Sequence, residues 1–199
     1  MTRKPGDSSM WCLVLAALVA LSTIAALLVA NRPYSLAGWF IRGTAMLGYL
    51  ALFAGIVSSA LVKWISRRFG RPFIQVHHLF SITGLLLLTL HPLGVVLQSK
   101  SLGVLVPSFA SLDSFLSLGG RPAWYLLAAT ALTALLRRTL KRSWRVIHTL
   151  NYAAFFLATA HAWMIGTDFG GGVVRVLTIG MTVVVVAVLL IKRLGLQRR

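Results

Sequence analysis

Six long apolar segments alternate with short polar or basic stretches along this 199-residue chain. They run over about 10–30, 38–62, 74–98, 122–140, 146–166 and 172–191. A helix needs about 20 apolar residues to cross a hydrocarbon core of about 30 Å, because it rises about 1.5 Å per residue. The pattern therefore predicts an all-α integral membrane protein, folded as a bundle of six transmembrane helices.

The first apolar segment follows a basic start, MTRKPGDSSM, which is also the layout of a signal peptide. Its apolar part is about 20 residues long, which exceeds a typical signal-peptide core. We favour a retained N-terminal helix over about 10–30. Since no linker or shift in composition divides the rest, we expect a single domain over residues 1–199.

A formal net charge of +17 is also typical of nucleic-acid-binding proteins, but the positions of the charges indicate membrane topology instead. Most of the 20 basic residues lie in alternate connections and at the two ends: Arg3, Lys4, Lys63, Arg67, Arg68, Arg71, Arg137, Arg138, Lys141, Arg142, Arg145, Lys192, Arg193, Arg198 and Arg199. The positive-inside rule then places both termini in the cytoplasm. Membrane lipid is the expected partner of these charges, and no nucleic acid is needed.

All five histidines fall in the third and fifth apolar segments, which are expected to run parallel: His77, His78, His91, His148 and His161. His77 and His91 are 14 residues apart and His148 and His161 are 13 apart, or about 21 Å and 19.5 Å of helical rise. We therefore expect two cross-helix pairs at matching depths. His77 pairs with His148 at the inner end, and His91 pairs with His161 at the outer end.

Each pair has the ligands for one haem iron. Imidazole is a good iron ligand, and two axial imidazoles leave no open position, which suits electron transfer. No Cys-x-x-Cys-His sequence is present, so the expected cofactor is haem b, with two groups bound. Ionisable groups within a membrane are costly and usually functional, which favours this interpretation over structural hydrogen bonding. A metal-ion transporter is the alternative function.

Helical phase separates the two adjacent histidines. A spacing of 14 returns to within about 40° of the same face, so His77 fits His91 better than His78 does. A spacing of 13 is about 140° out of phase in an ideal helix, so His148 and His161 require a distorted helix or a different approach angle. Gly84 lies midway between His77 and His91, either to give a macrocycle room or to let two helices pack closely.

Two of these segments resemble a known family. WRVIHTLNYAAFFLATAHAW (144–163) is similar to the fifth helix of bacterial MsrQ/YedZ-type haem proteins, which belong to the ferric reductase-like transmembrane superfamily. HHLFSITGLLLLTLHPL resembles that superfamily's pair of histidines with an internal Gly. The resemblance covers about 38–191 and implies haem ligation by His77 and His148 on the inner side and by His91 and His161 on the outer side.

The resemblance also implies a function. It is an electron-transfer subunit of an oxidoreductase in the cytoplasmic (inner) membrane, which passes electrons outward. A flavoprotein or quinol would be the donor, and FMN or quinone is a further candidate cofactor. The acceptor would be an extracytoplasmic protein such as a methionine sulfoxide reductase subunit, ferric iron or oxygen. The chain ends at 199, so we expect it to have no nicotinamide or flavin domain of its own.

Three further residues are candidates for the haem surroundings. Arg42 lies near the outer end of the second segment, where it would pair with a propionate or reach lipid headgroups. Arg145 would bind an inner propionate or act as a topology charge. Tyr152 is one turn from His148, so we expect it to pack in the haem pocket.

Overall fold

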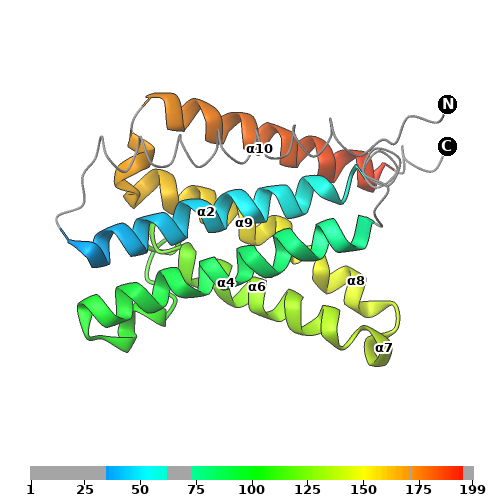
Figure 1. The fold of residues 1–199 in the computed structure, drawn as a ribbon, viewed down its shortest axis with the longest axis horizontal. Helices are drawn as coiled ribbons and strands as arrows, with labels where there is room; N and C mark the ends of the chain where they lie inside the picture. The colour runs from blue at the N-terminus through cyan, green and yellow to red at the C-terminus, as the bar shows by residue number, and fades with distance from the viewer. Residues whose placement is uncertain (1–34, 62–72, 171, 195–199) are drawn as a thin grey trace, which may run out of the picture.

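The computed structural model describes residues 35–61, 73–170 and 172–194, so the predicted helix over 10–30 lies outside the described residues (Figure 1). The helices described are α2 (Leu36–Ser58), α4 (Phe73–Ser99), α5 (Leu112–Ser117), α6 (Gly120–Leu135), α7 (Arg137–Leu140), α8 (Ser143–His148), α9 (Leu150–Ile165) and α10 (Gly172–Arg193), with 3₁₀ turns η1 (Leu102–Leu105) and η2 (Thr167–Gly170). None of these residues forms a strand, so the all-α prediction is confirmed for this part of the chain.

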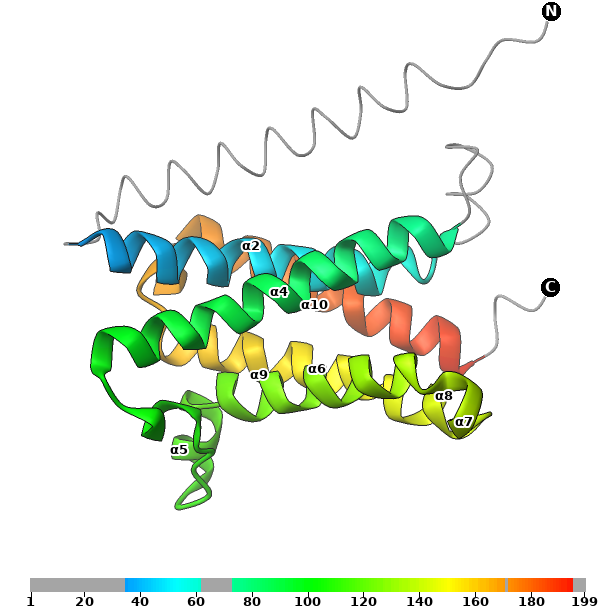
Figure 2. The ribbon, with the colours of Figure 1, turned by 60° about the horizontal axis from the view of Figure 1, so that its bottom comes forward.

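The main helices are arranged as two antiparallel pairs and a fifth helix. α2 packs along the length of α4, α6 packs against α9, and α10 contacts both α2 and α9 (Figure 2). Tyr49 of α2, Phe155 of α9 and Val185 of α10 belong to one buried apolar cluster. This cluster joins α2, α9 and α10 in one bundle, and its residue Phe155 lies in sequence between His148 and His161.

The outer surface of α4 is apolar. Large exposed side chains recur along one side of this helix at helical spacing: Leu79, Ile82, Leu86, Leu93 and Leu97. A soluble protein rarely exposes so long an apolar stripe, whereas lipid tails cover it at no cost. His77 and His91 point the other way, since both contact α2. The helix therefore has a surface suited to lipid and a surface directed into the bundle.

Within the described residues, three helices are long and apolar enough to cross a membrane: Leu36–Ser58, Ile74–Ser99 and Gly172–Arg193. This indicates a membrane protein. The predicted segments 122–140 and 146–166 do form helices, but each is interrupted. α6 ends at Leu135 and α9 begins only at Leu150, so each of these helices has 16 residues.

The connection between α4 and α6 contains the short helix α5. Ser111 caps α5 by accepting a hydrogen bond from the Ser114 backbone at 3.1 Å. Phe109 and Phe115 stack with ring centres 5.6 Å apart. Figure 2 shows α5 projecting away from the bundle. The connection also places the carbonyl of Ser117 beside α9, where it contacts a predicted ligand.

Candidate metal centre

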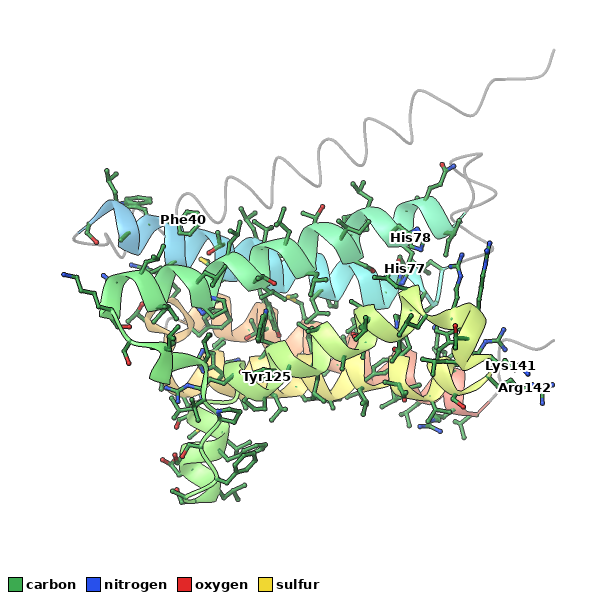
Figure 3. All side chains as sticks on the ribbon, turned by 90° about the horizontal axis from the view of Figure 1, so that it is seen from below. Phe40, His77, His78, Tyr125, Lys141 and Arg142 are labelled. Atoms are coloured by element: carbon green, nitrogen blue, oxygen red, sulfur yellow. The ribbon has the colours of Figure 1, made fainter. Side chains whose placement is uncertain are left out.

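The four predicted ligands lie in two groups along the bundle. α4 and the α8–α9 segment run in the same direction, as the sequence predicted (Figure 1). His77 and His148 are close together near the end that carries Lys141 and Arg142 (Figure 3). His91 and His161 lie further along the two segments, each against a backbone carbonyl. The structure therefore places His77 and His148 in ring contact, and His91 and His161 within electrostatic range of each other.

The inner pair has a spacing that suits one metal ion. The ring centres of His77 and His148 are 6.1 Å apart, with their planes at 67°. Two imidazoles on opposite sides of one ion, with metal–nitrogen bonds of about 2 Å, would have ring centres about 6 Å apart. The two side chains therefore match the spacing of an axial ligand pair.

His78 is exposed, whereas His77 is partly buried. Its ring centre is 6.3 Å from that of His77, so it borders the inner pair (Figure 3). His77 instead reaches into the bundle, where its Nδ1 contacts α2. The structure thus gives the two neighbours the different orientations that helical phase predicted.

Three of the four paired imidazoles place Nδ1 within hydrogen-bond distance of a backbone carbonyl oxygen. Nδ1 of His77 lies 3.1 Å from the oxygen of Gly55, and Nδ1 of His91 lies 3.0 Å from that of Ile41. Nδ1 of His161 lies 2.7 Å from the oxygen of Ser117. His148 differs: its ring nitrogens lie 3.5 and 3.4 Å from Asn151 Nδ2, and its own carbonyl accepts from that amide at 3.0 Å.

These contacts determine which ring nitrogen is available. A carbonyl oxygen can only accept, so the Nδ1 that contacts it carries the proton. In His77, His91 and His161 the lone pair is then on Nε2, where it can bind a metal. Metal-ligating histidines typically have such a second hydrogen bond, which fixes the tautomer and the ring orientation. The donor set therefore fits paired ligation by neutral imidazoles.

The irregular spacing of His148 and His161 has a local cause. α8 ends at His148 and α9 begins at Leu150, with Thr149 between them. The N–H groups of Thr149 and Tyr152 each bond a carbonyl three residues back, at 3.1 Å. Such tight turns advance about 20° more per residue than an α-helix does. The segment is therefore distorted in the direction that reduces the phase error, which selects helix distortion from the two explanations left open.

Gly84 packs against α2. A Cβ atom at this position would lie 3.2 Å from the backbone nitrogen of Leu52 and 3.3 Å from the Cβ of Ala51. The missing side chain therefore lets α2 and α4 approach closely, which is the second of the two roles considered. The expectation that Gly84 makes room for a macrocycle is corrected accordingly.

Arg42 has a protein partner. Its Nε donates to Oδ2 of Asp168 at 2.8 Å, and its Nη2 pairs with Oδ1 of the same carboxylate. Asp168 is buried, with only 5% of its surface exposed, in the η2 turn between α9 and α10. The expected pairing of Arg42 with a propionate or headgroup is therefore corrected. This residue ties the start of α2 to the end of α9.

Arg145 and Tyr152 lie at the inner end but differ in burial. Arg145 is exposed and its guanidinium carbon lies 5.9 Å from the centre of the Trp144 ring. Tyr152 packs against the buried cluster. Tyr152 therefore lines the region beside His148, as predicted, whereas the charge of Arg145 is directed toward a tryptophan.

Sequence reasoning missed three residues that border the pairs. Lys192 is close enough for its charge to act on both His77 and His148. Gly120 lies under the His161 ring, where a Cβ would be 3.0 Å from Nε2. Asn151 links His148 to Thr130, whose hydroxyl donates to the Asn151 side chain at 2.7 Å. Only Asn151 had a visible signal, as an amide within an otherwise apolar segment three residues after a predicted ligand.

The described residues contain no group of three or more His, Cys, Asp and Glu side chains that could hold a metal ion. Each candidate site consists instead of two imidazoles, the number of axial ligands that a haem iron takes. Comparisons of the chain with protein-family models, curated proteins and solved structures find no match.

Proposed function

We propose that this protein is a b-type cytochrome subunit that passes electrons across the cytoplasmic membrane through two bis-histidyl haems. In this proposal the chain has six transmembrane helices with both termini in the cytoplasm, and it is related to the ferric reductase-like transmembrane superfamily. His77 and His148 hold the inner haem, and His91 and His161 hold the outer haem. Electrons leave on the outer side to an extracytoplasmic acceptor.

The observation that carries the proposal is the repeated environment of the paired histidines. All four imidazoles come from two parallel segments. His77 and His148 are in ring contact, and His77, His91 and His161 each place Nδ1 against a backbone carbonyl. A histidine that served only as a core residue would need no partner on the opposite segment. Such second hydrogen bonds are typical of metal-ligating histidines, so they support axial ligation.

When bound, haem b supplies a one-electron couple between ferric and ferrous iron. The protein's own residues hold neutral imidazoles toward the bundle interior and direct their protonated Nδ1 atoms to fixed carbonyls. The buried cluster around Tyr49, Phe155 and Val185 excludes water from the bundle between the two levels. Low polarity there keeps an electron on the intended path and away from solvent.

The inner site lies at the basic end of the bundle, which is the cytoplasmic side under the positive-inside rule. A flavoprotein or quinol therefore donates to the inner pair, and FMN or quinone would bind at this end. The acceptor, whether a partner reductase or ferric iron, meets the outer pair.

The test is a dithionite-reduced-minus-oxidised spectrum of the full-length protein purified after haem-replete expression. We expect the bands of low-spin haem b and about two haems per chain. His77→Ala should lose one haem, whereas the matched neighbouring variant His78→Ala should keep both. A wild-type protein without a haem spectrum would contradict the proposal. Uptake of Zn²⁺ or Fe²⁺ into vesicles by that haem-free protein would then favour the metal-ion transporter.

A further inference from the structure

Lys192 lies at the C-terminal end of α10, directly before Arg193. Its side chain is anchored to the residue that caps the C-terminal end of α2. Its Nζ donates to Oγ of Ser59 at 2.7 Å. Ser59 caps the C-terminus of α2, and its hydroxyl donates to the carbonyl of Ile56 at 2.5 Å. α2 and α10 therefore meet at one hydroxyl, and the ammonium is held beside it.

The position of this ammonium relative to the histidines is its important feature. The charge of Lys192 acts on His77 of α4 and on His148 of α8, so it lies near both members of the inner pair. Ser58, the neighbour of its anchor, places its Oγ 3.3 Å from Nδ1 of His77. The ammonium has no lone pair and therefore cannot ligate a metal. Its charge also opposes any positive charge on the imidazoles and the iron, so its position there is unfavourable unless something compensates it.

An anion at the same place would make the cation favourable. The described acidic residues, Asp113 and Asp168, both lie toward the opposite end, in α5 and η2. A bound haem brings two propionate carboxylates, and a charge-assisted contact between ammonium and carboxylate is among the stronger hydrogen bonds in proteins. Arg145, the residue that the sequence suggested for this role, is directed to Trp144 instead.

We propose that Lys192, held by Ser59, is the partner of a propionate of the inner haem. This inference rests on the proposed function and assigns one residue of its inner site. Lys192 is a positioning residue: it does not ligate the iron. It fixes the haem's orientation and offsets the negative charge of the propionate near the iron.

The expected consequence is electrostatic. Ferric iron carries one more positive charge than ferrous iron, so an uncompensated propionate stabilises the ferric form. Lys192→Met should therefore lower the ratio of ferrous to ferric inner haem at a fixed solution potential, because the removed charge repels ferric iron more strongly than ferrous iron. Ser59→Ala, which leaves the ammonium but removes its anchor, should produce a smaller change in the same direction. Lys192→Arg should restore most of the ratio.

The experiment is an optical redox titration of the full-length protein in lipid nanodiscs. Lys141→Met is the matched control, because it removes the same charge at the same end of the bundle from an exposed position (Figure 3). A His161→Ala background, which is expected to hold only the inner haem, identifies the component that shifts.

The outcomes separate the two proposals. A shift confined to the inner component, absent in Lys141→Met and reversed in Lys192→Arg, supports the inference. Two haems with unchanged titrations in both Lys192→Met and Ser59→Ala would overturn it and leave the cytochrome intact. Equal shifts in Lys192→Met and Lys141→Met would also overturn it, since general surface charge or lipid phosphate would then explain the effect. A wild-type chain without haem would overturn both.

Discussion

α4 and the α8–α9 segment present equivalent pairs of histidines on backbones that differ. α4 is a continuous helix of 27 residues, and its two ligands are 14 residues apart on one face. The other segment breaks at Thr149, and its ligands are 13 residues apart. α4 takes both of its carbonyl acceptors from α2, whereas His161 takes its acceptor from Ser117 of α5 and the His148 ring contacts the side-chain amide of Asn151.

The difference shows that ligand orientation has two sources in this fold. On α4, regular helical phase is enough, and one antiparallel neighbour supplies two carbonyls along a single face. On α8–α9, phase alone fails, so a tightened turn, the Ser117 carbonyl and the Asn151 amide orient the rings. If this is correct, the two sides should be equally necessary for haem but unequal in their sensitivity to changes nearby.

The largest effect should come from the ligands themselves. We expect His91→Ala and His161→Ala each to remove the outer haem, about one of two per chain, because an iron that loses one axial imidazole loses the geometry that the other provides. The double variant should lose no more haem than either single variant. Haem content per protein measures this, and a double variant without any haem would contradict the pairing.

The next largest effect concerns the Arg42–Asp168 ion pair, which joins α2 to the turn that follows α9. Arg42→Gln leaves the Asp168 carboxylate buried without the guanidinium, which should lower the free energy of unfolding by about 3 kcal/mol. The double variant Arg42→Gln/Asp168→Asn removes both charges and should recover much of this loss. Thermal unfolding in detergent tests both variants. A stable Arg42→Gln protein with a displaced outer-haem potential would instead restore the propionate role that the sequence suggested.

The sequence was sufficient for features that depend on local pattern. Hydrophobic segments predicted the helices, and the 14-residue spacing selected His77 over His78. It could not reveal the partners of Arg42 and Gly84, because Asp168 lies 126 residues away and Leu52 belongs to another helix. It also missed Lys192, whose position at the inner site depends on how α10 packs against α2. Contacts between distant segments, rather than local periodicity, decide these roles.

A smaller effect is expected from Gly120, on the less regular side. A Cβ here would lie 2.9 Å from the His161 ring, closer than real contacts allow, so Gly120→Ala must move that ring. We expect the outer haem to bind about tenfold more weakly, equivalent to about 1.4 kcal/mol, with the inner haem retained. Haem titration of the apoprotein measures the affinity. Gly180→Ala is the control, because a Cβ there meets nothing within 4 Å.

The smallest effect should come from Gly84, on the regular side. A Cβ here meets the α2 backbone at 3.2 Å, which is tight, although the helix also gains from replacing glycine with alanine. Gly180→Ala in α10 has the same gain in open space, so the difference between the variants isolates the packing term. We expect Gly84→Ala to be less stable than Gly180→Ala by about 1 kcal/mol, with both haems retained. Loss of haem without loss of stability would mean that Gly84 faces the macrocycle. The orientation of the α4 ligands would then depend on a contact with the cofactor as well as on helical phase.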